Sequence, residues 1–445
     1  MSEETWHEAR LIPTSGINGK QEQERRATSA LLAVLGVVPE FSKSLLSKLG
    51  APSGKAATYI EVPFEAGDSK FYPDGLIRVT RGQKEWTALV EVKTGKNFLE
   101  AGQLERYLDI ARSQGFDALI TISNELVSIP GHHPIQVDKR KLRKVAMHHW
   151  SWTYVLSAAI MQKEHRGIED PEQAWILGEL VRYLEHDRSG ALQLDDMGQQ
   201  WVGVRDAVHA GTLRSNDSYA PEIVSRFDAL LRYASLALGQ KLGADVTQHL
   251  SRAELADPGT RVTAMVGQLV EKGQLSGAVR IPHALGPLYL VADLRANKVT
   301  WYVDIQAPRE GRAKTRVNWL VRQLKEAPGD LRIEVFQTRA RGSVAAELLS
   351  AVREQPELLT GDPNREMKSF RVALSVPMGG KRGRGQGAFI DSVLDSLDRF
   401  YAEVVQGLKE WVAKPPRLRE AEKGEPVPPQ LVSTDLSSQD GPESA

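Results

Sequence analysis

Apolar and polar positions in the first third of the chain follow an order typical of a mixed α/β domain. Ala27, Leu31 and Val34 recur at helical spacing before Gly36, which favours a helix that ends there. Runs rich in β-forming residues come next, and the short stretch 81–84 between two of them predicts a hairpin. The predicted elements are a helix at 20–35, strands at 58–64, 76–80 and 86–92, with a turn at 67–69, a helix at 99–113, and strands at 118–122 and within 142–150.

The period of the pattern changes twice further along the chain. Asp170-Pro171-Glu172 is a strong helix start, with an Asp cap, a proline in the first turn and an acid beside it. We expect helices at 151–163, 170–184, 195–210 and 221–238, then strands at 288–294, 299–305 and 331–336, with helices at 317–325 and 389–412. Trp150, Trp152 and Trp175 lie where apolar periodicity is strong, so we expect them in a core or a domain interface.

These patterns predict four regions. The first is an α/β domain with a mixed sheet flanked by helices, and a helical segment and an α+β domain of unknown role follow it. The last is a tail rich in Pro, Glu and Ser, with a composition typical of disorder. The predicted boundaries are 1–163, 164–245, 246–413 and 414–445.

Composition limits the classes of protein that fit. The 445 residues contain 57 basic and 57 acidic residues and no cysteine, which excludes disulfides, thiolate metal sites and a cysteine nucleophile. Residues 424–445 carry four acids and no base, so 57 bases face 53 acids in the rest of the chain. This balance excludes a protein that coats nucleic acid by bulk charge but allows local basic contacts. The acidic start and the short apolar runs predict a soluble cytoplasmic protein without a membrane partner.

One constellation of residues carries chemistry. Asp74 precedes a predicted strand, and Glu91 and Lys93 end the next one. Because side chains alternate along a strand, Glu91 and Lys93 point to the same side, and a hairpin would bring Asp74 beside them. Two adjacent carboxylates repel each other and tend to hold a proton, and a hard cation such as Mg²⁺ relieves that repulsion. Two carboxylates, a bound cation and a lysine are groups that can hydrolyse a phosphodiester.

The sequence Pro73-Asp74…Glu91-Val92-Lys93 resembles the PD-(D/E)xK nuclease superfamily, which has a restriction-endonuclease-like fold. The predicted order of helix, three strands, helix and strand is similar to that superfamily's core. In the second helix, Gln103 and Tyr107 form a Q-x-x-x-Y pattern that resembles the RecB-like branch. The resemblance covers roughly residues 20–150, about a third of the chain.

The resemblance implies a role for each position. Asp74, Glu91 and the Val92 carbonyl would bind Mg²⁺, with Mn²⁺ as a substitute, and Lys93 would orient the attacking water. Glu24, which shares a helix face with the apolar stripe, would be an accessory ligand or a partner of one. The neighbouring side chains Gln103 and Tyr107 would contact the nucleic-acid backbone.

Two functions follow, and the residues alone leave both open. The first is a metal-dependent deoxyribonuclease in bacterial DNA restriction, defence or repair. The second is a catalytically silent scaffold that binds nucleic acid or protein in a stress-response or defence complex, because a fold does not establish a function. Expected partners are DNA, a second copy of the chain in a homodimer, and a protein bound through the C-terminal domain.

Three weaker signals remain. The run 139–144, which includes Lys139, Arg140 and Lys141, fits either phosphate contacts or a solvated sheet edge. The loop Gly379–Gly387 is basic and glycine-rich, and it either grips nucleic acid or is a mobile connection. The pairs His132-His133 and His148-His149 invite a metal interpretation, but adjacent strand residues face opposite ways, so a surface or packing role is favoured.

Overall fold

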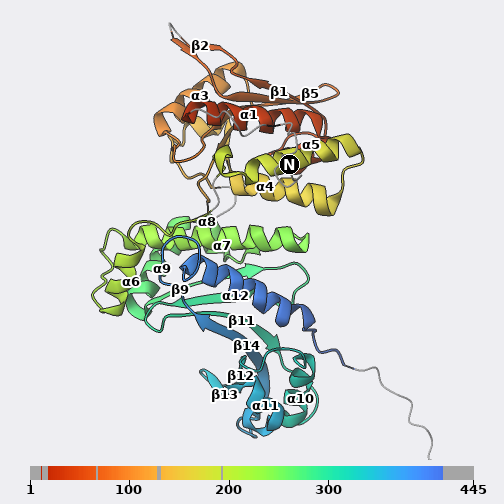
Figure 1. Cartoon of the computed structure of the whole chain (residues 1–445), viewed down its shortest axis with the longest axis vertical. Coiled ribbons are helices and arrows are strands. Elements are labelled where there is room, and N and C mark those ends of the chain that lie inside the picture. The colour runs from red at the N-terminus through yellow and green to blue at the C-terminus, as the bar shows by residue number, and fades with distance from the viewer. Residues whose placement is uncertain (1–11, 13–18, 67–68, 128–131, 192–193, 414–445) are drawn as a thin grey trace, which may run out of the picture. The chain divides into compact units, whose positions relative to one another are not determined.

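The computed structural model describes residues 12, 19–66, 69–127, 132–191 and 194–413. Two large β-sheets organise them, a five-stranded sheet in the N-terminal part and a seven-stranded sheet in the C-terminal part (Figure 1), and helices lie between the two in the sequence. The predicted turn at 67–69 and the predicted tail at 414–445 lie wholly or largely outside the described residues. Each of the two sheets has its own apolar core.

The N-terminal sheet is mixed, as predicted. Its strand order is β1-β4-β5-β6-β7, in which β1, β4 and β5 run antiparallel and β5, β6 and β7 run parallel. The elements are α1 (Lys20–Val37), α2 (Pro39–Leu46), β1 (Lys55–Ile60), β2 (Phe64–Ala66), β3 (Ser69–Phe71), β4 (Gly75–Arg81), β5 (Lys84–Val92), α3 (Ala101–Gln114), β6 (Ala118–Ser123), β7 (Ala146–Ser151) and α4 (Trp152–Ile160).

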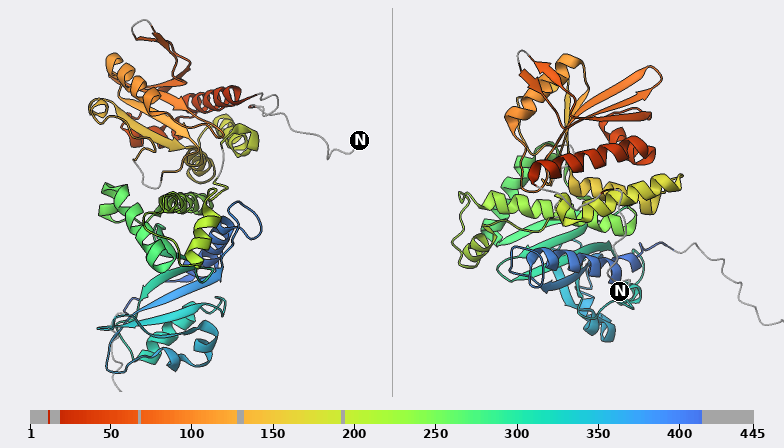
Figure 2. Two further views of the ribbon diagram at one scale, coloured as in Figure 1. Left: turned by 90° about the vertical axis from the view of Figure 1, so that its left-hand side faces the viewer. Right: turned by 45° about the horizontal axis from the view of Figure 1, so that its top comes forward.

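Helices cover both faces of this sheet (Figures 1 and 2). Val90 and Val92 of β5 join the apolar cluster under α1 and α4, whereas Leu89 joins the cluster under α3. Since consecutive side chains point to opposite faces, a strand covered on both sides needs an unbroken apolar run. β5 has that run, buried from Trp86 to Val92, and Glu91 is its one charged member.

The first predicted strand is too long at its C-terminal end. β1 ends at Ile60, and residues 64–66 instead pair with 69–71 in a separate hairpin. Two residues account for the break. Glu61 has a left-handed backbone with φ of 50°, and Pro63 has no N–H to donate to a ladder.

α1 buries the predicted stripe, including Ala27, Leu31 and Val34. α2 was not predicted, although Pro39 stands at its first position, where proline is favoured. Within the described residues no single helix is long and apolar enough to cross a membrane. The segments Gln21–Val37 and Pro39–Leu49 meet the length and composition limits only together, with a bend of 107° between them.

The middle of the chain is helical. Asp170 caps its first helix as predicted, because its carboxylate accepts hydrogen bonds from two N–H groups of the first turn. The buried residues of the first helix belong to the N-terminal core, and those of the next two belong to the C-terminal core. The predicted helix at 195–210 is confirmed only over 201–209, and the domain boundaries stay predictions. The three helices are α5 (Pro171–Glu185), α6 (Trp201–His209) and α7 (Ala220–Leu242).

Two of the three tryptophans lie in a core. Trp150 and Trp152 are buried, whereas the prediction for Trp175 is wrong, since 53% of that residue is exposed. The apolar stripe of α5 runs through Leu177 and Leu180. A residue two positions before Leu177 faces away from such a stripe.

The C-terminal sheet is antiparallel throughout, with strand order β13-β12-β14-β11-β10-β9-β8. The α+β prediction is thereby refined to an antiparallel sheet with helices. The elements are β8 (Thr247–Gln248), α8 (Arg252–Ala256), α9 (Pro258–Lys272), β9 (Gln274–Arg280), β10 (Leu288–Asp293), β11 (Lys298–Gln306), α10 (Ala313–Gln323), β12 (Arg332–Gln337), β13 (Ser343–Leu348), α11 (Leu349–Glu354), β14 (Met367–Pro377) and α12 (Phe389–Glu403).

The predicted hairpin of β10 and β11 is confirmed, and its turn includes Asn297 with a left-handed φ of 51°. β14, an unpredicted strand, lies between β11 and β12 in the middle of the sheet. The final helix is shorter than predicted, since α12 ends at Glu403 and not at 412. Val404 there has backbone angles outside the helical region, which ends the helix.

Candidate active site

The ends of β4 and β5 bring the three motif residues together. Gly75 pairs with Val90 across the hairpin, so Asp74 stands at the end of β4 beside Glu91. The Asp74 carboxylate accepts a hydrogen bond of 2.7 Å from the Val92 N–H. Lys93 Nζ lies 2.6 Å from Glu91 Oε1. The predicted grouping of Asp74, Glu91 and Lys93 therefore exists in the fold.

Gly75 is required by close packing. A Cβ atom at this position would lie 2.4 Å from Leu32 Cδ1 on α1 and 3.2 Å from the Tyr59 carbonyl oxygen on β1. A side chain there would require the buried Leu32 side chain to shift and the Tyr59 carbonyl group to give by a few tenths of an ångström. The sequence Asp74-Gly75 is thus the start of a buried strand, and the glycine fixes where the Asp74 backbone lies.

Burial controls the charge state of the two carboxyl groups. Glu91 is 1% exposed. Loss of water, and next the nearby charge of Asp74, raise the pKa of Glu91 to about 8. Burial also raises the pKa of Asp74, although its hydrogen bond from the Val92 N–H opposes that change. The pair therefore holds a proton in the absence of a cation, as two carboxylates in contact should.

Lys93 is the countercharge of this pair. Burial is the largest single influence and lowers the pKa of Lys93, but attraction to Glu91 and then Asp74 outweighs it and raises the pKa overall. The ammonium group is therefore held in its charged form beside the carboxylates. A fixed cation in a low-dielectric site interacts strongly with nearby charge that develops on a reacting group.

Glu24 reaches this cluster from α1. Its Oε2 atom lies 4.0 Å from Lys93 Nζ, and its other carboxylate oxygen accepts a hydrogen bond from the Asn97 side chain. Glu24 is therefore a partner of Lys93 in this state. Asn97 was missed by sequence reasoning, and the available signal was a polar residue in the loop that follows the E-x-K strand.

Gln103 and Tyr107 are adjacent on α3, as their spacing predicts. The Gln103 amide donates to the Tyr107 hydroxyl at 3.3 Å, and that hydroxyl donates to the Tyr72 carbonyl oxygen at 3.4 Å. The Tyr107 ring itself is buried in the cluster under α3. The pair thus supports the backbone just before Pro73 and Asp74, and contact with a nucleic acid stays a prediction.

Two aromatic side chains missed by sequence reasoning flank the site in sequence. Tyr72 is two residues before Asp74, and Phe98 follows Asn97. They are 55% and 69% exposed, respectively. In the sequence, both are large rings in short segments outside any apolar stripe, and this position could have indicated that they are exposed.

The predicted basic run precedes β7 and packs partly against α3. Lys141 forms an ion pair with Asp109 of α3, and Arg140 pairs with Asp138 at 2.8 Å. Lys139 is exposed. Local acids therefore engage two of the three residues proposed to contact phosphate.

The histidines form a polar network on the α3 side of the sheet. Thr121 is in register with Glu91 on one side and His149 on the other, so the three side chains lie in a row. Thr121 Oγ1 lies 2.7 Å from His133 Nε2 and 2.9 Å from His149 Nδ1. Burial lowers the pKa of both histidines to about 4.

One hydrogen-bond pattern satisfies this network. His149 Nε2 lies 2.9 Å from the Glu125 carbonyl oxygen, which can only accept, so the proton is on Nε2. His149 Nδ1 then accepts from the Thr121 hydroxyl, and His133 Nε2 donates to Thr121. The Ile135 N–H completes the chain by donating to His133 Nδ1 at 3.0 Å. Both rings are neutral here, which supports the favoured packing role for His133 and His149.

The donor set fits a hard divalent cation. Asp74 and Glu91 supply two carboxylates. Burial disfavours their charged forms, and a cation between them would stabilise those forms. The N–H and C=O of a strand residue face the same neighbour, so the Val92 carbonyl points to the Asp74 side. In the described residues, no group of three or more His, Cys, Asp or Glu side chains converges on a metal position.

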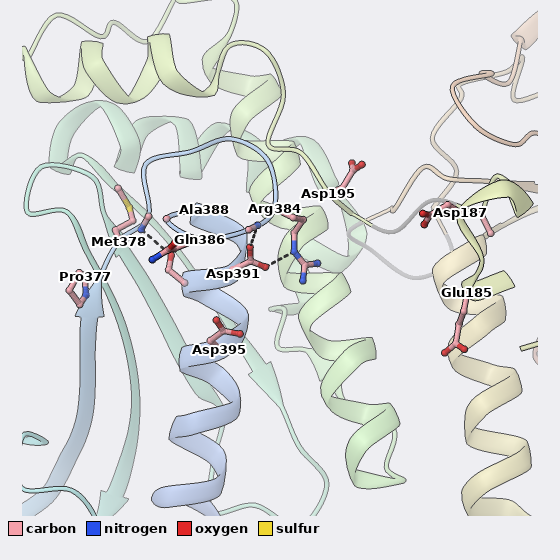
Figure 3. Close-up of a pocket in the computed structure, with 15 residues that line it drawn as sticks. Glu185, Asp187, Asp195, Pro377, Met378, Arg384, Gln386, Ala388, Asp391 and Asp395 are labelled. Carbon is pink, nitrogen blue, oxygen red and sulfur yellow. Dashed lines mark hydrogen bonds and ion pairs between the residues drawn. The ribbon is translucent and has the colours of Figure 1, made fainter. Parts of the chain in front are cut away.

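The glycine-rich loop is tied down at the start of α12 (Figure 3). Asp391 accepts hydrogen bonds from the Arg384 side chain and the Gly385 N–H. The Lys381 N–H donates to the Gly387 carbonyl at 3.0 Å. Two of its basic side chains are therefore engaged by acids outside the loop, Arg384 by Asp391 of α12 and Arg382 by Asp196.

Comparison of this sequence with protein-family models and with curated proteins found no match.

Proposed function

We propose that this chain is a Mg²⁺-dependent nuclease that hydrolyses phosphodiester bonds of DNA, in bacterial restriction, defence or repair. The observation that carries the proposal is the buried Glu91 carboxyl group beside Asp74, with Lys93 Nζ at 2.6 Å. A structural ion pair does not need a second buried carboxyl group that raises the pKa of the first. Perturbed groups of this kind cluster at functional sites.

The chain's own residues have distinct roles in this proposal. Asp74 and Glu91, with the Val92 carbonyl, hold the cation, and Gly75 fixes the backbone beside them. Lys93 orients the attacking water and stabilises the charge that grows on the phosphoryl oxygens. Glu24 and Asn97 position the Lys93 side chain.

A bound Mg²⁺ ion would neutralise phosphate charge and lower the pKa of a bound water. Its binding must displace the proton that Asp74 and Glu91 hold. We therefore expect binding to release protons and to strengthen as the pH rises toward 8. Mn²⁺ suits the same oxygen ligands and is expected to substitute.

The test measures cleavage and metal binding separately. Purified full-length protein is incubated with supercoiled plasmid, linear duplex DNA, single-stranded DNA and RNA, with Mg²⁺, Mn²⁺ or a chelator. We expect cleavage of DNA that needs the metal and is lost in Asp74→Asn. Calorimetric titration of Mn²⁺ should show binding with proton release, and Asp74→Asn should weaken that binding.

Lys84→Ala is the matched control, since Lys84 is an exposed lysine at the other end of β5. It should cleave and bind Mn²⁺ as the wild type does. Absence of cleavage of every nucleic acid, with normal folding and no Mn²⁺ binding, would reject the enzyme. That outcome would favour the alternative, a nuclease-fold scaffold that binds nucleic acid or protein in a stress-response or defence complex.

A further inference from the structure

The C-terminal sheet has one packed face and one open face. Helices α7, α9 and α12 contact the strands from one side (Figure 1), where Leu290, Trp301 and Val372 are fully buried. The alternate residues of the same strands are half-exposed, as the burial patterns of β10, β11 and β12 show. The open face therefore runs across four neighbouring strands, β10, β11, β14 and β12.

Aromatic rings and one guanidinium group form a ladder across this open face. The rings of Tyr289 and Tyr302 stack with centroids 5.0 Å apart and 15° between their planes. The Arg371 guanidinium lies 3.9 Å from the Tyr302 ring centre and 5.1 Å from that of Phe336. Asp304 holds Arg371 with two hydrogen bonds of 2.8 and 2.9 Å. The four groups are thus held in a fixed order, one from each strand.

A positively charged cavity adjoins the Phe336 end of the ladder. Its volume is about 470 Å³, within the range of small-ligand sites. Arg339 and Lys368 line it and are exposed, and neither forms an ion pair among the described residues. Its one acid is Asp304, which already pairs with Arg371. Two cations are therefore available beside an aromatic surface.

We propose that this open face binds single-stranded nucleic acid. Bases would stack on the outer faces of the two end rings, Tyr289 and Phe336, because Tyr302 and Arg371 are covered by their neighbours in the ladder. Backbone phosphates would contact Arg339 and Lys368. Single-strand binding combines these elements, aromatic stacking and a basic track for the backbone. A duplex keeps its bases stacked inside the helix, so its bases cannot reach the rings.

A protein partner fits these observations less well. Protein interfaces are also rich in tyrosine, phenylalanine and arginine, but they are depleted in lysine. A protein partner would need acids to match Arg339 and Lys368, whereas every nucleotide carries a phosphate. The charge of the cavity thus selects nucleic acid as the occupant.

The test measures binding without cleavage. Full-length protein in a chelator is titrated into fluorescent oligo-dT, oligo-U and a duplex of equal length, and anisotropy is recorded. We expect saturable binding of oligo-dT, and binding of oligo-U alone would assign the face to RNA. Replacing Phe336 by Ala, or Tyr289 by Ala, should weaken binding by about tenfold, the loss of stacking with one base. Tyr289→Phe keeps the ring and should keep the affinity.

The contribution of the two cations is tested in the same titration with the double variant Arg339→Ala and Lys368→Ala. Loss of two phosphate contacts should flatten the slope of log affinity against log salt by about 1.4. Tyr59→Ala and Lys84→Ala are matched controls, because both residues are exposed and belong to the N-terminal sheet, and they should bind within about twofold of the wild type.

Two outcomes would overturn the proposal. One is equal binding by the ladder variants, the controls and the wild type, or no binding at all. The other is a Tyr289→Ala variant that changes the oligomeric state in sedimentation and leaves nucleic-acid binding unchanged, which would make this face a protein interface. The proposal does not depend on nuclease activity, since binding is measured without metal, so the two proposals can fail separately.

Discussion

The two sheets hold their charged residues in opposite surroundings. In the N-terminal sheet, helices cover both faces, and Glu91 and Lys93 pair at 2.6 Å inside the protein. In the C-terminal sheet, Asp304 and Arg371 pair at 2.8 Å on the half-exposed face. The contact distances are similar, but in the covered pair burial raises the pKa of the Glu91 carboxyl group to about 8.

This difference shows that pairing distance is a poor guide to chemical consequence. Water screens the Asp304–Arg371 pair, so its charges interact weakly with anything further away. The covered pair lacks that screening, so each proton or cation that arrives changes the energy of the whole cluster. The predictions below compare the same kind of substitution in the two settings, from the largest expected effect to the smallest.

The largest effect should come from removing the covered cation. Lys93→Ala leaves two buried carboxyl groups without a countercharge, and cleavage should fall by at least about 100-fold. Initial rates of plasmid cleavage at saturating Mg²⁺ measure this. Lys298→Ala removes an exposed lysine at the start of β11 and should leave the rate within about twofold. Equal rates for the two variants would mean that the covered lysine has no part in the chemistry.

The Glu91 carboxyl group should make the metal-free protein less stable at high pH. Its pKa is about 8 in the folded protein against 4.5 in an unfolded chain, so the folded state binds more protons between these values. The contribution of Glu91 to the free energy of unfolding is therefore fully present below pH 4.5, and it is lost as the pH rises toward 8. Between pH 5 and pH 8 the melting temperature in a chelator should fall by about 5 °C more in the wild type than in Glu91→Gln.

Added Mg²⁺ should cancel this loss in the wild type at pH 8 and have no such effect on Glu91→Gln. The exposed carboxylate of Glu65 provides a control, and Glu65→Gln should follow the wild-type pH profile. A wild-type profile that rises over this range would show that Glu91 is ionised without a cation.

The histidine network should act in the opposite direction. The pKa values of His133 and His149 are about 4, below the usual 6.5, so the unfolded state binds more protons between these values. The contribution of these two histidines to the free energy of unfolding is fully present above pH 6.5, and it is lost as the pH falls toward 4. In a Glu91→Gln background, which removes the opposing titration, the melting temperature should fall by about 5 °C from pH 6.5 to pH 4.5.

Replacing both histidines by glutamine in that background should flatten the profile. His132→Gln is the control, because His132 is outside the Thr121 network, and it should keep the slope. An unchanged slope after the double substitution would show that other groups cause the acid sensitivity.

The smallest effect should come from the open ion pair. Asp304→Ala removes both hydrogen bonds to Arg371, yet the free energy of unfolding should change by less than about 1 kcal/mol. Urea denaturation at neutral pH measures this change. A loss of unfolding free energy well above that limit would mean that the Asp304–Arg371 pair is shielded from water, as the Glu91–Lys93 pair is.

The site was easier to predict from sequence than the C-terminal fold. The buried run that surrounds Glu91 required a strand covered on both faces, and the positions of Asp74 and Lys93 followed from alternation and the hairpin. Asn97 and the hydroxyl of Tyr107 could not be placed in the same way, because their partners Glu24 and Tyr72 are far away in sequence. Contacts of that kind depend on tertiary structure.

The missed strand β14 did carry a signal. Phe370, Val372 and Leu374 alternate with other residues, and all three are buried against the helices. Arg371, between the first two, and Ser375, after the third, occupy the open face, as period-2 alternation requires. The end of β1 had a weaker signal, since the left-handed backbone of Glu61 follows from its surroundings and not from its residue type.

Gly75 has a consequence for the genetics of this protein. Since Leu32 of α1 fills the space of the absent side chain, we expect a bulkier residue at position 32 to displace the backbone beside Asp74. Such variants should be temperature-sensitive, functional in the cold and inactive on warming, in a chain that still accumulates. Plasmid cleavage by cell extracts at two temperatures would then test the contact between helix and carboxylate without any purified protein.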